Sequence, residues 1–350
     1  MNSGRVLVET LGGGSEDAEW TVLAVDGRPV RWRSILRVLP IGVQPLLVQA
    51  YRRRARVAAR LPARVFGEPG ADPTVEVVVA VTPVLGPRDR VHAIQVCYAS
   101  GGDAMPLPYI VAAVDYSSDE RSIYLAANPF GWRLPDGRSS WTVPEAFRFV
   151  ERFDEAMDLI LRTLDPVERL SWAGDLTVRA GDAARRYRLV LRGGAGGERT
   201  QLRGLLLDVT ESLAPEPASV DYATLAALGR RHADHSYLAL ADVHKLRIIR
   251  WITDPVPGIQ WKGTVDQRDT AHPDDLACVR GELERVLREG LSRNVIENIR
   301  MRRIGGGWTV IDVVSTMVPG SQPPVLLLIE MTVVGHTDDP DPTEPDLVDG

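Results

Sequence analysis

The sequence has few cysteines and no long apolar segment. Its two cysteines, Cys97 and Cys278, are far apart and lack a CxxC or Cys/His companion, which argues against a disulfide framework and fits a reducing compartment. No run of about 18 or more apolar residues occurs, so we expect no membrane-spanning helix. The N-terminus lacks the apolar core and cleavage site of a signal peptide. These absences predict a cytoplasmic protein without a membrane partner.

Lysine is also scarce, because Lys245 and Lys262 are the only lysines among 41 basic residues. We attribute this to the base composition of the gene. The net charge is −6, and the six acidic residues after position 335 account for all of it. A nearly neutral body does not suit non-specific nucleic-acid binding, so we expect no nucleic-acid partner. The Asp- and Pro-rich segment 336–350 is predicted to be a disordered tail.

The last third of the chain predicts one helix and several strands. Residues 248–251 have the pattern of a strand, and a helix is expected to lead into this part from Tyr222 to about Leu240. His272 and two aspartates suit the start of a helix whose apolar residues recur at steps of three and four up to Leu287. Three antiparallel strands are then expected, at positions 295–302, 308–317 and 325–334, with a glycine turn before the second.

The same order recurs earlier in the chain. The middle third predicts a helix ending at Leu164 and then strands, while the first third predicts a helix over 44–54 and strands at 62–66, 74–81 and 91–97. We therefore predict an α+β fold of three tandem units, each an antiparallel sheet flanked by helices that can enclose a small pocket. The expected boundaries are 1–103, 106–213 and 232–335.

Two segments carry a resemblance to a known family. His272–Asp275, followed by a helix, a strand and Gly-Gly-Trp308, resembles the second half of a PAS domain. Leu207–Glu211 resembles the Asp-Ile-Thr-Glu ending through which many PAS domains join the next module, so the resemblance makes its polar residues candidates for signal relay: Asp208, Thr210 and Glu211. Over nearly its full length the layout is similar to an actinobacterial family of sensor-domain-only proteins with one GAF and two PAS domains and no effector.

That resemblance implies three tandem PAS/GAF-like sensor domains. Such domains bind small molecules or partner signalling proteins and relay the signal by domain rearrangement, and they supply no catalytic residues of their own. Helices that flank PAS domains often pair, so a homodimer is expected. The resemblance specifies no cofactor.

Aromatic and histidine residues are the candidate site residues. Five tryptophans are candidates for lining ligand pockets, and packing in the core is the competing interpretation: Trp251, Trp261, Trp308, Trp132 and Trp141. His232 and His235 would share a helix face with Asp234 between them, as in a metal site. Because only His244 stands nearby as a further ligand, we favour a solvated helix face over metal binding.

No catalytic motif of a serine hydrolase, zinc protease, kinase or cyclase is found. We therefore predict a non-enzymatic signalling scaffold. Two alternatives stay open: an enzyme of unrecognised type, such as a hydrolase, and a purely structural interaction module.

Overall fold

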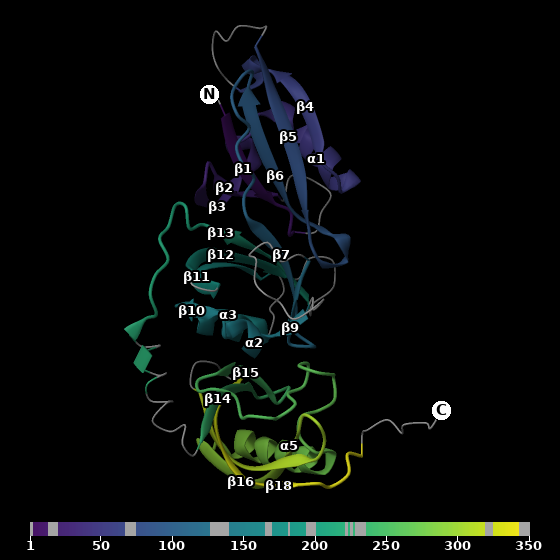
Figure 1. Cartoon of the computed structure of the whole chain (residues 1–350), viewed down its shortest axis with the longest axis vertical. Coiled ribbons are helices and arrows are strands. Elements are labelled where there is room, and N and C mark those ends of the chain that lie inside the picture. Colours follow the sequence, from purple (N-terminus) through teal and green to yellow (C-terminus); the bar gives the residue numbers. More distant parts are fainter. Residues whose placement is uncertain are drawn as a thin grey trace, which may run out of the picture. The chain divides into compact units, whose positions relative to one another are not determined.

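The computed structural model describes residues 3–12, 20–66, 75–126, 140–164, 170–180, 183–193, 201–220, 223–224, 227, 236–318 and 325–342. Its strands form three mostly antiparallel sheets of six, seven and five strands, here named A, B and C (Figure 1). The fold is α+β with several antiparallel sheets, as the sequence predicts. It divides into two compact units, the second made of Glu120–Ser122, Trp141–Arg148 and Ala218–Gly350, and the first of the remaining residues.

Sheet A has the strand order β3-β2-β1-β6-β5-β4. Its strands are β1 (Ser3–Glu9), β2 (Thr21–Val25), β3 (Arg28–Ser34), β4 (Val57–Pro62), β5 (Glu76–Leu85) and β6 (Val91–Ser100). Helix α1 (Gln44–Arg53) packs on one face, and short 3-10 turns lie at Ile35–Arg37, Ile41–Val43, Ala63–Phe66 and Pro87–Asp89. The strand expected at 62–66 is wrong, since β4 ends at Pro62 and a 3-10 turn follows. Strands β1 to β3 were not predicted.

Sheet B has the order β10-β11-β12-β13-β7-β8-β9. Its strands are β7 (Val111–Ser117), β8 (Ser122–Leu125), β9 (Ser140–Thr142), β10 (Val150–Arg152), β11 (Ser171–Ala180), β12 (Ala183–Gly193) and β13 (Gln201–Asp208). Helices α2 (Val143–Phe147) and α3 (Ala156–Leu164) lie between β9 and β11 in the sequence.

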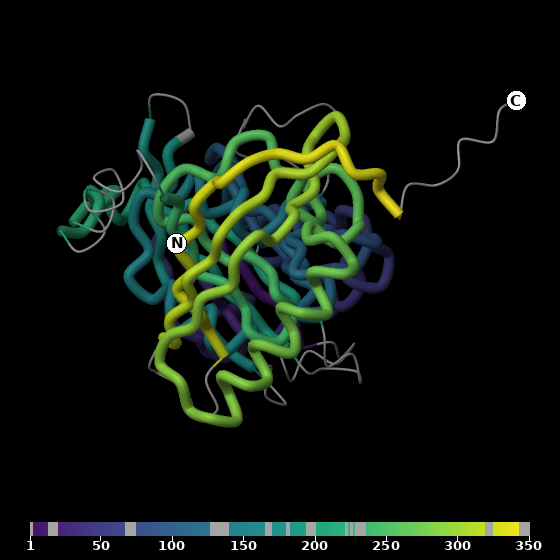
Figure 2. The backbone as a smooth tube through the Cα atoms, turned by 90° about the horizontal axis from the view of Figure 1, so that it is seen from below, coloured from purple at the N-terminus to yellow at the C-terminus, as the bar shows by residue number. Residues whose placement is uncertain are grey.

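Sheet C has the order β15-β14-β18-β17-β16. Its strands are β14 (Tyr237–Asp242), β15 (Arg247–Trp251), β16 (Arg293–Arg302), β17 (Trp308–Met317) and β18 (Leu326–Thr337), with α5 (Pro273–Glu289) between β15 and β16. Figure 2 shows β18 in yellow running beside β17. The turn before β17 contains three glycines with positive φ, a conformation that glycine adopts without steric strain.

The three sheets share one strand order. In each sheet the first strand pairs with the last, as β1 with β6, β7 with β13 and β14 with β18. Five strands are common to the three sheets. The second of them lies beside the first on its outer side, and the fourth and then the third follow the last. The chain therefore repeats one sheet topology three times, with a helix inserted before the third of these five strands.

Sheets A and B pack against each other, and the central strands of sheet A are buried on both faces. Val6 and Val8 of β1 point into the core under α1, whereas Leu7 between them enters a second core with Leu205 and Leu207 of β13. Continuous apolar runs are typical of such doubly covered strands. The sequence predicts separate modules, each covered by its own helices. Instead, the first two sheets share a buried core and form one compact unit.

Buried polar contacts also join these two sheets. Glu9 is fully buried and accepts hydrogen bonds from Arg192 at 2.7 Å, from Thr21 at 2.7 Å and from the backbone N–H of Leu11 at 2.8 Å. His92 and Asp115 form a second buried pair, with 2.6 Å between Nε2 and Oδ1. Because each buried polar group needs a partner, these contacts fix how the two sheets meet.

Two expectations about the ends of the third sheet are corrected. The helix expected up to Leu240 is wrong at its end, because residues 237–242 form β14; most of its earlier part lies outside the described residues. The tail expected to be disordered from residue 336 is ordered up to residue 342. Asp339 and Asp341 pair there with Arg300 and Arg268, at 3.5 Å and 3.1 Å. Residues 343–350 lie outside the described residues.

Helix α5 is fixed to sheet C at its first turn. His272 is the N-cap and accepts a hydrogen bond from the backbone N–H of Asp274 at 3.2 Å, as the sequence predicts. Asp275 accepts three hydrogen bonds from Arg300 of β16: from the backbone N–H at 2.8 Å, from Nε at 3.0 Å and from Nη2 at 2.8 Å. This carboxylate holds the start of α5 against the strand.

Replacing Asp275 by Asn should lower the free energy of unfolding at neutral pH by about 1.5–3 kcal/mol, the range for hydrogen bonds to charged groups. Burial acts to raise the pKa of Asp275, but the hydrogen bonds and charge of Arg300 outweigh it and hold the pKa below its ordinary value. Because the folded-state pKa is the lower one, the stabilisation is full above the unfolded-state pKa of about 3.9 and is lost as the pH falls through the folded-state value. Urea denaturation of both proteins from neutral to acidic pH checks this; a difference that does not shrink in acid would contradict it.

Candidate functional site

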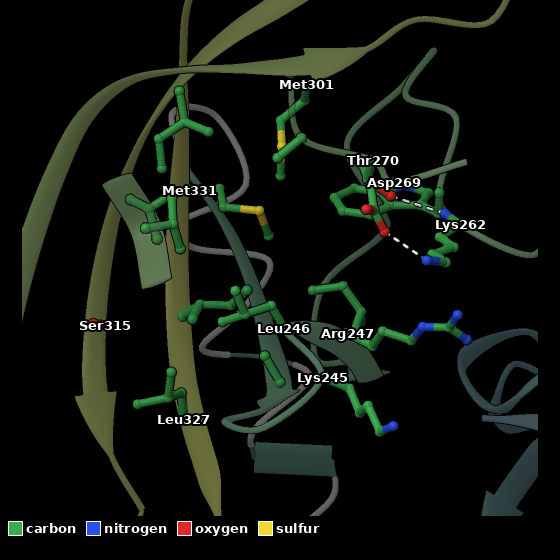
Figure 3. Close-up of a pocket in the computed structure, with 18 of the residues that line it drawn as sticks. Lys245, Leu246, Arg247, Lys262, Asp269, Thr270, Met301, Ser315, Leu327 and Met331 are labelled. Atoms are coloured by element: carbon green, nitrogen blue, oxygen red, sulfur yellow. Dashed lines mark hydrogen bonds and ion pairs between the residues drawn. The ribbon is translucent and has the colours of Figure 1, made fainter. Parts of the chain in front are cut away.

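The second unit encloses a cavity of about 270 Å³. Its walls come from the strands of sheet C, from one face of α5, and from the segment between β15 and α5 (Figure 3). The two short segments of the unit, Glu120–Ser122 and Trp141–Arg148, also contribute lining residues. All the described residues that line the cavity thus belong to this one unit.

The interior of the cavity is apolar because alternate residues of each strand face it. Every second residue of β18, namely Leu327, Ile329 and Met331, lines it. On β16 a β-bulge breaks the alternation between Ile296 and Ile299, so both residues line the cavity despite their odd spacing. Helix α5 adds apolar residues at helical spacing: Leu276, Val279, Leu283 and Val286.

Two tryptophans form one wall. Trp251 and Trp261 meet edge to face, with ring centroids 5.0 Å apart and an interplanar angle of 68°. Among the described residues no atom accepts a hydrogen bond from the buried Nε1 of Trp261. An unsatisfied buried donor costs about 1–3 kcal/mol. Because this nitrogen has almost no accessible surface, it lies inside the wall, where an acceptor atom in the cavity does not reach it.

Positive charge surrounds this apolar interior. Besides Arg121, five cationic side chains line the cavity: Arg148, Lys245, Arg247, Lys262 and Arg280. Only two acidic side chains do so, Glu145 and Asp269. In Figure 3 the charged ends of Lys245, Arg247 and Lys262 lie on one side of the cavity, whereas Met331 and Leu327 lie on the other. The cavity is amphipathic, with an apolar interior and a cationic side.

The acidic lining residues are occupied by local contacts. Asp269 is 2.5 Å from Nζ of Lys262. Glu145 accepts hydrogen bonds from the backbone N–H and the hydroxyl of Thr142, both at 2.8 Å, and so caps α2. Among the described residues Arg148 and Arg280 form no ion pair. The cationic side of the cavity therefore keeps an excess of positive charge.

A buried ion pair anchors Glu120–Ser122 in the second unit. The Arg121 and Asp242 side chains are 4% and 0% exposed, and Nε of Arg121 donates to Oδ2 at 2.9 Å. Arg121 has a φ of +51°, which is unusual for a residue other than glycine. Arg247 donates to the carbonyl of Glu120. These contacts place the Arg121 guanidinium in the cavity wall.

The structure separates the five candidate tryptophans. Trp251 and Trp261 line the cavity. Trp308 is fully buried in the core, stacks edge-on to His272 and donates to the carbonyl of Asp339 at 2.9 Å. Trp141 is buried but is not a lining residue, and Trp132 lies outside the described residues.

The relay candidates belong to the first unit and bind arginines there. Asp208 pairs with Arg185 at 2.9 Å, and Glu211 pairs with Arg5 of β1. The hydroxyl of Thr210 accepts a hydrogen bond from the backbone N–H of Arg186 at 3.0 Å. The end of sheet B is thus tied to sheet A and to its own neighbouring strand.

The metal candidates His232, Asp234 and His235 lie outside the described residues. Within the described part of the chain, no group of three His, Cys, Asp or Glu side chains is placed to hold a metal ion. Of the cysteines, Cys97 is buried, and burial raises the pKa of its thiol, whereas Cys278 is exposed on α5.

Sequence reasoning did not identify the cationic residues of the cavity. The lysine count could have indicated two of them, because both lysines of the chain line the same cavity. We had attributed the rarity of lysine to base composition alone, which overlooked where the two exceptions lie.

The fold has three antiparallel sheets, and the cavity lies in the unit that contains sheet C. Models of one known protein family match both ends of the chain. Residues 5–107 match the family "Rv3651-like, N-terminal", and residues 225–324 match "Rv3651-like, C-terminal domain". Together the matches cover more than half of the sequence, and the chain belongs to the Rv3651-like family. The composition of one GAF and two PAS domains stays a prediction.

Solved structures give the fold alone. The crystal structure of an uncharacterized protein from Mycobacterium tuberculosis is similar with a TM-score of 0.69 and 17% identity, covering 94% of this chain and 96% of that chain. An RNA-binding light-oxygen-voltage receptor gives a TM-score of 0.25 and 9% identity over 64% of this chain and 96% of that one, which is too low to support an argument. No curated protein matches the sequence. Among the described residues, no helix is both long and apolar enough to cross a membrane.

Replacing Arg121 by Met should destabilise the second unit by about 3–5 kcal/mol, because it leaves Asp242 buried without a cationic partner. Adding Asp242→Asn should recover part of this loss, since Asn removes the charge but can still accept the hydrogen bond from the His244 backbone N–H. Urea denaturation of the single and double variants measures both effects. Arg293→Met, at an exposed position, is the control and should change stability by less than about 0.5 kcal/mol. An equal loss in control and Arg121 variant would contradict the argument.

Proposed function

We propose that the chain is a non-enzymatic sensor scaffold of three tandem PAS/GAF-like domains, one GAF and two PAS. In this proposal it binds small molecules or partner signalling proteins and relays the signal by rearrangement of its domains. The observation that carries the proposal is the apolar cavity with a cationic side in the second unit. The strand order shared by the three sheets supports three related modules.

The relay would use the two short segments in the cavity wall. Arg121, Thr142 and Glu145 line the cavity, yet the chain on either side of each segment belongs to the first unit. A ligand that displaces these residues therefore acts on segments joined covalently to the first unit. This connection supports a relay from ligand binding to the domain arrangement.

The lining residues favour binding over catalysis. Among the described residues that line the cavity, four carry hydroxyl groups: Ser315, Thr142, Thr264 and Thr270. No histidine or cysteine is among the described lining residues. A hydroxyl nucleophile needs an adjacent general base, and the acids in this lining are engaged by Thr142 and Lys262. The hydrolase alternative therefore gains no support from this site. An internal cavity also favours sensing over a purely structural module.

Homodimer formation and a cytoplasmic location complete the proposal. Both come from the resemblance to sensor-domain proteins and from the sequence composition.

Filling the cavity should abolish ligand binding without unfolding the chain. Ala241 of β14 is a buried lining residue, and Ala241→Phe places a ring in the cavity. We expect native mass spectrometry of the freshly purified chain to show a retained small molecule. This signal should disappear in Ala241→Phe.

Val313→Phe, from a different strand of the same wall, is a second filling variant in case the first does not fold. Ala58→Phe, at an exposed position of β4, adds the same ring outside the cavity and should leave binding intact. If the unmodified chain retains no molecule, or if both filling variants retain it as well as the unmodified chain does, the cavity is not a ligand site.

A further inference from the structure

The cavity contains chemistry that selects one class of ligand, if the proposed function holds. Its size, its apolar interior and the charge on one side are independent observations. Each restricts the ligand in a different way, and together they favour a small apolar body with one anionic group at one end.

Size limits the ligand to a small molecule. A dry apolar cavity of about 150 Å³ takes up benzene, which has six carbon atoms. By proportion, the cavity of about 270 Å³ corresponds to roughly ten to twelve non-hydrogen atoms. This is too small for a nucleotide cofactor or a flavin.

The interior requires an apolar body. Met331 is fully buried, and Leu327 and Ile299 are 5% exposed. The walls from β16, β18 and α5 offer methyl, methylene and thioether groups, which recognise hydrocarbon by shape and burial. A ligand with polar groups along its whole length would lose its hydration there without replacement hydrogen bonds.

The cationic side requires an anionic acceptor at one end. Lys245 is exposed, and the ammonium of Lys262 has three N–H donors, of which Asp269 engages one. Figure 3 places the side chains of Lys245 and Lys262 on the same side of the cavity. A carboxylate supplies two oxygens for these donors.

We propose that the cavity binds a monocarboxylate with an apolar body of about ten carbon atoms, its carboxylate held by Lys245 and Lys262. The apolar body lies against the strands of sheet C and α5. This inference rests on the proposed function, because it names the ligand class of the same site.

Three probes with the same ten-carbon chain and different head groups test the class. Isothermal titration of the full chain, at probe concentrations below micelle formation, compares decanoate, 1-decanol and decyltrimethylammonium. We expect decanoate to bind one per chain, decanol to bind at least about tenfold more weakly, and the cation to show no saturable binding. Added salt should weaken decanoate binding and leave decanol binding unchanged, because salt screens exposed charges.

Removing the two lysines tests the head-group site. Lys245→Gln/Lys262→Gln should lower the affinity for decanoate at least about tenfold and leave the affinity for decanol unchanged. The matched control Arg288→Gln/Arg293→Gln removes the same charge from exposed positions of the second unit that do not line the cavity. The control should bind both probes like the unmodified chain.

Amine acetylation gives a second measurement that needs no variant. Because Lys245 and Lys262 are the only lysines, an amine-reactive acetylating reagent modifies them and the N-terminal amine alone. Decanoate should slow acetylation of both lysines, as followed by peptide mass spectrometry, while decanol should not. The N-terminal amine serves as the internal reference.

The outcomes separate the two proposals. Equal binding of decanoate and decanol, or decanoate binding that neither depends on the lysines nor protects them, would overturn the carboxylate class while the cavity remains a ligand site. Preference for decyltrimethylammonium would overturn the class and the charge argument together. If no probe binds and the filled variant Ala241→Phe behaves like the unmodified chain toward every ligand, the proposed function itself fails.

Discussion

The pairing of the first strand of each sheet with its last strand is the constraint on which the rest of this structure depends. β14 joins β18 in sheet C, and β1 joins β6 in sheet A. Such pairing puts the first strand in the interior of the sheet and leaves the middle of the segment free to cross one face as a helix. In sheet C that face, closed by α5, is where the cavity forms.

The cavity exists because the side chains of sheet C and α5 do not fill the space between them. The bulge in β16 turns Ile296 and Ile299 to the same side, and Asp275 holds α5 against that strand through Arg300. Helix α5 is therefore fixed to sheet C at its first turn, and the two tryptophans and the charged side chains complete the lining of the cavity. An apolar interior beside a cationic opening follows from this geometry and needs no catalytic group.

Local patterns in the sequence predicted local structure well. The N-cap at His272 and the bounds of β17 follow from capping and alternation, which depend on neighbouring residues only. The first strand of sheet C was mistaken for helix because Leu and Ala have high helix propensity, and pairing with β15 and β18 overrides that preference. Two of the candidate tryptophans line the cavity. Its cationic residues could not be predicted from the sequence, because only tertiary contacts bring them together.

The ion pair between Arg121 and Asp242 has a consequence for how such a protein can be divided. The family match at the C-terminal end covers residues 225–324 and suggests a portable domain. A gene segment limited to that region would encode a buried acid without its base and would lack the whole of β18. The second unit is therefore discontinuous in sequence, and recombination near residue 225 would separate Arg121 from Asp242.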